Sequence, residues 1–578
     1  MLASCSSPMD GTSWFSSENN FVTVIFEDNE YCCIEEKIFF LPKGEDLTVH
    51  LDFQDGYSLE SVNYADYSYE IDAFGDGDLC LKEIQYSVRV QIQAEMIGVI
   101  MNYHLNGGSF LDTSKNTEDQ FSVIDTLNNH PRPNVSIGTD VIYREGYVQV
   151  GWNTQSDGSG THVGLGSRIS VENGKVNLYA EWVPYTKIGY FKYEQVDDGY
   201  KIISFCGPLE GEILCIPQKV GGKDVVELGE NLFWNISYKR VILPPSIKRL
   251  ATNAFAEFDI QTLTFFDNIQ TISDGAFNSQ MVHYVDVQAC IPPRFLSGND
   301  NAQFSEDMDH LILAKDKKKM VFYAGCSMSY GLCSPMVDSA FIDYEIFNMS
   351  VIGGVNALFQ MNAIRHYLKQ DDIFVHAPEE MSPHQLLNSK QLEMRMFILV
   401  EANYDLLKFT DFHSFSGFFD AFYEYNQLRF KLVSQDYEQF NNNYNEYGDI
   451  IFSRPNSSGD AYYGLETCFD TSLLNNTTKN NLNEFYCSLK DKGVNVLFSY
   501  APINKNAVYK EDGGLLHSKE YELFMKSSIT EAKIISKLSD YIMPGQYFYD
   551  TDYHLSEEGA KIRTERLITD IEEGFFQD

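Results

Sequence analysis

The chain is 578 residues long and carries 83 acidic against 43 basic side chains, a formal net charge of −40. That length is enough for several domains, each with its own core. Nucleic acid and anionic membrane surfaces are bound by clustered Lys and Arg, so this charge balance excludes both as partners. The eleven cysteines include no Cys-x-x-Cys pair, and we expect neither a metal site nor a cofactor.

Residues 1–19 are expected to be a polar tether. Leu2-Ala3-Ser4-Cys5 has the form of a bacterial lipobox, in which the cysteine is lipidated. The basic and apolar segments that should precede a lipobox are missing, so either the start is truncated or misplaced or the match is due to chance. If the lipobox holds, Cys5 anchors the protein at the cell surface, and no apolar stretch of about 18–20 residues offers another attachment.

Residues 20–98 predict an all-β module of the sandwich type. Short runs rich in β-branched and aromatic residues, such as 21–26 and 47–53, alternate with turns rich in Gly, Asp and Asn. None of these residues suggests chemistry.

Residues 99–190 predict a second β module. Its motifs are Asn106-Gly107-Gly108, Gly151-Trp152-Asn153, Asp157-Gly158-Ser159-Gly160 and Leu178-Tyr179-Ala180-Glu181-Trp182. They resemble the β-grasp-type repeat of Gram-positive surface proteins, the Listeria–Bacteroides or internalin B type. The resemblance implies a stalk or an adhesion unit. We interpret His104 and His162 as ordinary strand or turn residues and not as metal ligands.

Residues 191–295 contain an internal repeat. Phe233, Phe255 and Phe277 are 22 residues apart, and two further apolar registers repeat with the same period. A fixed period of this length predicts a solenoid, here of about three turns with one short strand each. The pattern resembles the treponemal type of surface leucine-rich repeat. That resemblance implies adhesion or display, with a host or surface ligand as partner.

Residues 296–317 are expected to be a linker, and residues 318–578 an α/β domain. From Lys319 onward strand-like runs alternate with helical periods, which predicts a three-layer domain around a parallel sheet. Function in such sheets lies at the carboxyl ends of the strands. The polar stretch 436–480 interrupts this pattern and predicts a surface insertion, a lid or a substrate loop.

Ser327 follows the first of these strands, between Gly325 and Gly331. Near the other end of the chain, His554 stands just before a helix that Ser556 can cap. Asp550 and Asp552 precede His554 by four and two residues, and a carboxylate beside a histidine can hold its Nδ1–H so that the other nitrogen acts as a base.

These blocks resemble the SGNH (GDSL-type) hydrolases, a family of flavodoxin-like α/β enzymes. The resemblance implies Ser327 as nucleophile, His554 as base and an aspartate that orients it. We favour Asp552, because Asp550 would need a bulged loop and Thr551 fills the family's commoner aspartate slot. Cys326 is interpreted as a packing residue.

Backbone donors to the oxyanion are expected at Ser327 and in the loop with Ser350, Gly353 and Gly354. The family's third block, Gly-x-Asn-Asp, is absent. The oxyanion hole would then lack its asparagine or take an amide from elsewhere, such as Asn356 or Asn504.

The sequence therefore predicts a multidomain surface protein: all-β modules, a short leucine-rich-repeat solenoid and an SGNH-type domain. Its expected function is that of an extracellular serine esterase or O-acyltransferase acting on an acylated cell-wall or extracellular polysaccharide. The alternative is a non-catalytic adhesion protein whose SGNH-type domain has lost activity.

Overall fold

The computed structural model describes residues 20–54, 56–71, 76–110, 120–126, 134–171, 175–255, 257–277, 281–294, 303–304, 307–308, 310–312, 314, 317–325, 327–350, 357–378, 393–401, 403–431, 443–462, 469, 471, 475–508 and 514–577. Cys5, Cys326, Gly353, Gly354 and Asn356 lie outside these residues, as does the side chain of Ser327.

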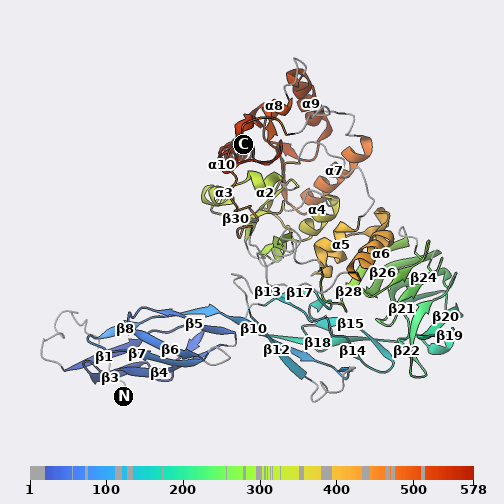
Figure 1. Cartoon of the computed structure of the whole chain (residues 1–578), viewed down its shortest axis with the longest axis horizontal. Helices are drawn as coiled ribbons and strands as arrows, with labels where there is room; N and C mark the ends of the chain where they lie inside the picture. Colours follow the sequence, from blue (N-terminus) through green and yellow to red (C-terminus); the bar gives the residue numbers. More distant parts are fainter. Residues whose placement is uncertain are drawn as a thin grey trace, which may run out of the picture. The chain divides into compact units, whose positions relative to one another are not determined.

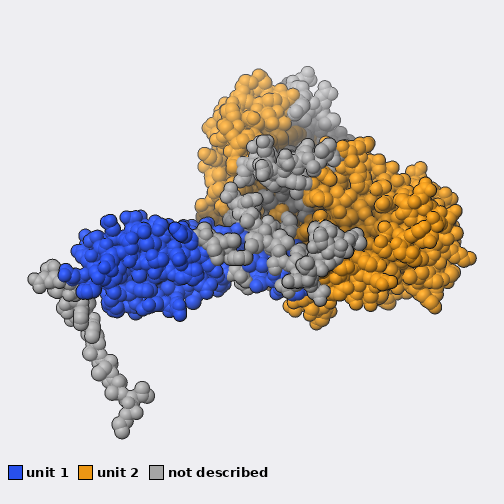
Figure 2. All heavy atoms as spheres, turned by 60° about the horizontal axis from the view of Figure 1, so that its bottom comes forward, with its two compact units in different colours: residues 1–104, 120–135, 170–178 blue, residues 105–119, 136–169, 179–578 orange. Residues whose placement is uncertain are grey.

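The chain forms two compact units, coloured separately in Figure 2. Unit 1 contains residues 1–104, 120–135 and 170–178, and unit 2 contains residues 105–119, 136–169 and 179–578. Figure 1 shows the strands and helices of both units and labels many of them. Among the described residues, no helix is both long and apolar enough to cross a membrane.

Unit 1 is built from short β-strands, and those between residues 21 and 96 share one apolar core. One sheet has the order β3 (Ile38–Pro42), β1 (Phe21–Phe26), β8 (Val88–Val90), and a second has the order β2 (Cys32–Cys33), β4 (Leu47–Phe53), β7 (Gly77–Leu81), β6 (Tyr67–Ile71). Strands β5 (Tyr57–Val62) and β9 (Ile92–Met96) pair, as do β10 (Gly98–His104) and β12 (Gln120–Thr126). Val24, Leu51 and Leu79 are fully buried in the core, where the alternation of apolar residues places them.

Unit 2 begins with short strands around β15 (Tyr147–Asn153), which pairs antiparallel with β16 (His162–Val163) and with β18 (Lys175–Pro184). Strand β11 (Ser109–Phe110) pairs with β14 (Ile142–Tyr143). The unit boundaries fall within β13 (Asn134–Ser136), β17 (Arg168–Ser170) and β18, so each of these strands has residues in both units. Asn153 organises the loop after β15: its Nδ2 donates to the carbonyl of Gly158, and its Oδ1 accepts from the N–H of Gly160. The Gly-Trp-Asn and Asp-Gly-Ser-Gly motifs are therefore one local structure.

The 22-residue repeat forms a solenoid with two strands per turn, where the sequence predicted one. The first parallel ladder contains β20 (Gly199–Phe205), β23 (Lys223–Leu228), β25 (Arg249–Leu250) and β27 (Thr271–Ile272). The second contains β21 (Glu210–Cys215), β24 (Trp234–Ile242), β26 (Glu257–Phe266) and β28 (Val282–Gln288). At the start of the solenoid, after the 3₁₀ turn η2 (Ile188–Tyr190), β19 (Phe191–Val196) pairs antiparallel with β20, and β22 (Lys219–Val220) pairs antiparallel with β23.

The apolar repeat stacks inside the solenoid. The ring centroids of Phe233 and Phe255 are 4.8 Å apart, and those of Phe255 and Phe277 are 4.6 Å apart with nearly parallel planes. Residues one period apart thus occupy the same register on successive turns, which buries a continuous core.

Residues 318–577 form an α/β domain around a five-stranded parallel sheet. Its strand order is β30 (Tyr344–Asn348), β29 (Lys318–Tyr323), β31 (Ile373–His376), β32 (Asn495–Phe498), β34 (Lys533–Ile534). The helices are α2 (Ser327–Gly331), α3 (Ser334–Ala340), α4 (Ala357–His366), α5 (Arg395–Val400), α6 (Phe418–Arg429), α7 (Asn476–Lys490), α8 (Lys505–Val508), α9 (Gly514–Ser528) and α10 (Glu557–Ile571). Shorter elements are η4 (Tyr404–Phe409), η5 (Phe412–Ser414), η7 (Leu538–Asp540), η8 (Gly545–Tyr547), the terminal π-helix η9 (Glu572–Phe576) and the pair β33 (Ile503–Asn504) and β35 (Ile542–Met543).

The solenoid and the α/β domain share one core. Helix α6 packs on the last turns of the solenoid, where Phe419 stacks on Phe277 with 4.0 Å between ring centroids. Arg429, at the end of α6, is buried and lies 2.8 Å from the Asp267 carboxylate and 3.1 Å from that of Glu401. Of the segment predicted to be a linker, Phe304, Met308 and Leu311 are buried in this core.

Candidate active site

The central strand β29 leads directly into the short helix α2. The last five residues of β29 are buried, and the turn that follows places Gly325 at φ +62°, a left-handed conformation that glycine adopts without strain. Helix α2 begins at Ser327. Since the two neighbours of β29 in the sheet are β30 and β31, Ser327 follows the strand at which the chain order reverses, where open parallel sheets form a crevice.

His554 lies in a closed loop before α10. Phe548 and Leu555 form an antiparallel bridge at the base of this loop, and the backbone N–H of His554 donates to Thr551 Oγ1 at 2.9 Å. Ser556 caps α10 by accepting from the Gly559 N–H, as the sequence predicted. The base and the tip of the loop are therefore both held by hydrogen bonds.

The two aspartates of this loop have different partners. Asp550 Oδ1 lies 2.8 Å from His554 Nδ1, in the position that orients an imidazole. Asp552 is fully buried, and its Oδ1 accepts from Asn504 Nδ2 at 2.8 Å and from the Tyr462 N–H at 3.1 Å. The sequence favoured Asp552 as the residue that orients His554, but in the structure the carboxylate beside His554 Nδ1 is that of Asp550. The winding of the loop around Thr551 Oγ1 makes this possible, because it turns Asp550 toward the ring.

Tyr330 connects the histidine loop to helix α2. The rings of Tyr330 and His554 are stacked, with 3.9 Å between centroids and 4° between planes. Tyr330 is three residues after Ser327 in α2, and residues three apart in a helix lie on the same side. The stacking therefore brings the imidazole against helix α2, within one helical turn of the position of Ser327.

The expected oxyanion donors lie only partly within the described residues. Ser350 follows β30 and is fully buried, and its hydroxyl accepts from the Ala324 N–H at 2.9 Å. This bond ties the chain after β30 to the turn after β29. The side-chain amide of Asn504, an alternative donor, donates instead to Asp552 and to the Asp460 carbonyl.

Sequence reasoning missed two residues that support this site, Asp449 and Arg454. Asp449 accepts from the hydroxyl and the N–H of Ser334 and from the amide of Asn348, so it ties the start of α3 to the end of β30. Burial raises the pKa of this carboxyl, and the hydrogen bonds oppose the shift. Arg454 donates to the Leu555 carbonyl beside the histidine loop, and its guanidinium lies 5.8 Å from the centre of the Tyr330 ring.

Both residues belong to the stretch that the sequence predicted to be a surface insertion. Asp449 and Arg454 are 4% and 5% exposed, respectively. The only signal that could have found them is a charged residue among aromatic ones, in the segments Tyr447-Gly448-Asp449 and Ile451-Phe452-Ser453-Arg454.

Comparison with known proteins identifies one region of the chain. Residues 220–292 match the family model of the BspA type leucine rich repeat region, in six copies. The leucine-rich-repeat prediction is thereby confirmed, whereas no SGNH-type domain is detected by the family models. No curated protein and no solved structure matches the chain.

Proposed function

We propose that residues 318–578 are an SGNH-type serine hydrolase or acyltransferase domain whose triad is Ser327, His554 and Asp550. The observation that carries this proposal is the stacking of His554 on Tyr330, one helical turn from Ser327. The strand order supports it, because numbering the five parallel strands along the chain gives 2-1-3-4-5, the flavodoxin-like order.

The proposed reaction begins with attack by Ser327 Oγ on an ester carbonyl. His554 takes the serine proton at Nε2 while its Nδ1–H donates to Asp550, which stabilises the imidazolium that forms. The tetrahedral oxyanion would accept from the backbone N–H of Ser327 and from the loop with Ser350, Gly353 and Gly354. The alcohol leaves with the proton from His554, and water or a sugar hydroxyl then releases the acyl group from the serine.

The proposed substrate is an acylated cell-wall or extracellular polysaccharide. A BspA-type repeat region beside the α/β domain supports a location at the cell surface, with Cys5 as the proposed lipid anchor. The repeats would also present a face to a host or surface ligand. No cofactor has a part in this chemistry.

A fluorophosphonate probe, which phosphonylates activated serines, tests the proposal. We expect the wild-type protein to be labelled and Ser327→Ala not to be, whereas Ser339→Ala, which changes an exposed serine of α3, keeps the wild-type labelling. Equal labelling of wild type and Ser327→Ala contradicts the proposal. Hydrolysis of p-nitrophenyl acetate serves as the second readout.

A non-catalytic adhesion protein is the second candidate. The side-chain amide of Asn504 favours this candidate, because it donates to Asp552 in the loop before α10. It is therefore not directed at a substrate oxygen, as an oxyanion-hole donor would be. Absence of both labelling and ester hydrolysis in a wild-type protein that is folded by circular dichroism would favour this candidate.

A further inference from the structure

A hollow of about 790 Å³ opens in unit 2, away from Ser327 and His554. One wall comes from β18 and the loop after β15, with Ser156, Asp157 and Trp182. The facing wall is the second ladder of the solenoid, where Arg240, Thr262 and Tyr284 occupy one register on three successive turns. The volume lies in the range of small-molecule sites.

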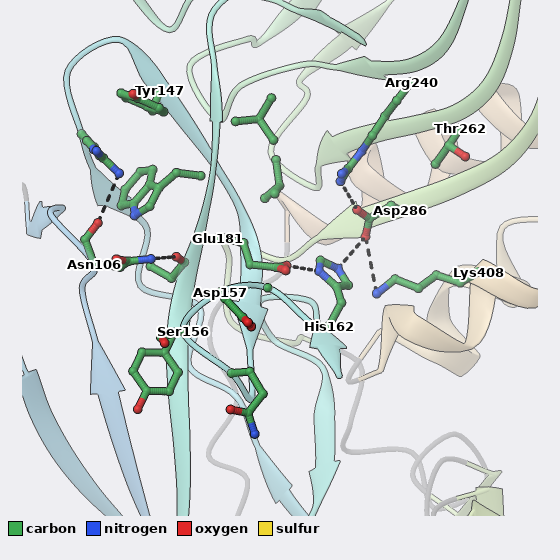
Figure 3. A pocket seen from close by; sticks show the side chains of 18 of the residues that line it. Asn106, Tyr147, Ser156, Asp157, His162, Glu181, Arg240, Thr262, Asp286 and Lys408 are labelled. Carbon is green, nitrogen blue, oxygen red and sulfur yellow. Dashed lines mark hydrogen bonds and ion pairs between the residues drawn. The ribbon is translucent and has the colours of Figure 1, made fainter. Parts of the chain in front are cut away.

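An ion-pair cluster closes one side of the hollow. His162 lies between the carboxylates of Glu181 and Asp286, and Arg240 Nη2 and Lys408 Nζ lie 3.1 and 3.6 Å from Asp286 (Figure 3). Burial by itself would lower the pKa of His162. Hydrogen bonds to Asp286 and Glu181 outweigh this effect and raise the pKa to about 9, so the ring is charged at neutral pH. These groups are held by one another and form a polar wall.

His162 reaches this cluster because residue 151 is glycine. Gly151 has φ +137°, and a Cβ there would lie 2.7 Å from the imidazole carbon Cε1 of His162. The Gly-Trp-Asn motif is therefore needed to seat the histidine, in addition to ordering its own loop.

The charges that line the hollow nearly balance. The cationic side chains are Arg144, His162, Arg240 and Lys408. The acidic ones are Asp157, Glu181 and Asp286. A charged ligand of either sign would therefore lie near side chains of its own sign. A hydroxyl group both donates and accepts hydrogen bonds, so it can bind to the cationic and to the acidic side chains.

Aromatic rings line the hollow beside these polar groups. Tyr147, Tyr179, Trp182 and Tyr284 all contribute, and Figure 3 shows Tyr147 and Asn106 on the side away from the His162 cluster. Rings that combine a flat apolar face with a polar tip suit a ligand that is apolar on one side and polar at its edge. A pyranose ring has this character, because its C–H bonds form an apolar face and its hydroxyls form the rim.

Tyr284 extends the site along the solenoid. This residue is 37% exposed and also lines a second hollow of about 420 Å³, formed with Lys239, Asp259 and Gln261 on the same strands. Two hollows that share one tyrosine suit a ligand of several linked rings better than a single ring.

We propose that this face of unit 2 binds a neutral oligosaccharide, with sugar rings against Tyr284 and the aromatic wall and hydroxyls on the His162 cluster. The site contains no residue of the proposed triad, and binding to it requires no catalysis.

Binding of a panel of neutral tetrasaccharides of glucose, galactose, mannose and N-acetylglucosamine, measured by isothermal titration calorimetry, tests the proposal. We expect at least one to bind the full chain. Tyr284→Ala should weaken that binding about tenfold or more, which corresponds to a loss of about 1.4 kcal/mol or more. Ser156→Trp, at an exposed loop position, should block the hollow. Both residues lie at the surface, so the fold should persist.

Trp234→Ala is the matched control, because Trp234 is a 58% exposed aromatic of the same solenoid that lines neither hollow. Binding that is unchanged in Trp234→Ala, weakened about tenfold or more in Tyr284→Ala and lost in Ser156→Trp supports the proposal. No binding of any neutral tetrasaccharide, equal binding by all variants, or tighter binding of tetragalacturonate or of a glucosamine tetramer would overturn it.

Discussion

Replacing Asp550 and Asp552 one at a time separates two roles within the loop before His554. Asp550 is 46% exposed, and its carboxylate is hydrogen-bonded to His554 Nδ1. In Asp550→Asn the side chain no longer stabilises the imidazolium, and the wrong imidazole tautomer is favoured. We expect the rate to fall by up to about 10⁴-fold, the effect of the same change in a serine protease triad, and by less if solvent substitutes for the exposed carboxylate. Exposed ion pairs contribute about 0–1 kcal/mol, so stability should barely change.

Asp552 should show the opposite pattern. In Asp552→Ala the amide of Asn504 and the N–H of Tyr462 lose their acceptor in a buried place. An unsatisfied buried polar group costs about 1–3 kcal/mol, so the free energy of unfolding should fall by about that amount for each donor that water cannot reach. Activity measured well below the melting temperature should fall by much less than in Asp550→Asn.

The two variants are compared by fluorophosphonate labelling rate and by urea unfolding of the full chain. A large loss of labelling in Asp552→Ala, together with wild-type labelling in Asp550→Asn, would refute the assignment of Asp550 and restore Asp552 as the orienting residue. Equal effects of both changes on both readouts would show that the loop acts as one structural unit.

Three further predictions concern other parts of unit 2. Arg429→Ala leaves the buried carboxylates of Asp267 and Glu401 without their cation, and we expect a loss of about 3–5 kcal/mol in urea unfolding; a loss under 1 kcal/mol would contradict the burial of this cluster. Tyr330→Ala removes the ring on which His554 stacks and should slow labelling of Ser327, whereas Tyr330→Phe keeps the ring and should label like wild type. The pKa of His162 rises from 6.5 to about 9 on folding, so its protonation stabilises the folded state by at most about 3 kcal/mol. This stabilisation is complete below pH 6.5 and is lost as the pH rises through 9. Stability followed across that range should fall in wild type and vary less in His162→Gln.

The repeats and the strand–helix alternation could be read from the sequence because their signals are local. Phe233, Phe255 and Phe277 recur at one period because each turn of a solenoid presents the same side chain to the same core. The turn after β29 was predicted for a similar reason, since a glycine and a serine after an apolar run mark where a strand ends. The second strand of each solenoid turn was missed, because the exposed–buried alternation of β24 and β26 covers only about five residues and then gives way to a continuous buried run.

The candidate site divides in the same way. The sequence by itself determined which residue types stand at the strand end and before the last helix: Ser327, His554 and two aspartates within reach of the histidine. Only the tertiary structure distinguishes the surroundings of those aspartates. Asn504 and Tyr462, about 50 and 90 residues away in the chain, donate hydrogen bonds to buried Asp552, whereas Asp550 lies 2.8 Å from the imidazole of His554. The pocket lined by His162, Arg240 and Lys408 likewise has no sequence signature, since its residues meet only when separate modules pack together. Local periodicity is written along the chain, whereas partners in a buried polar network are set by packing between distant segments.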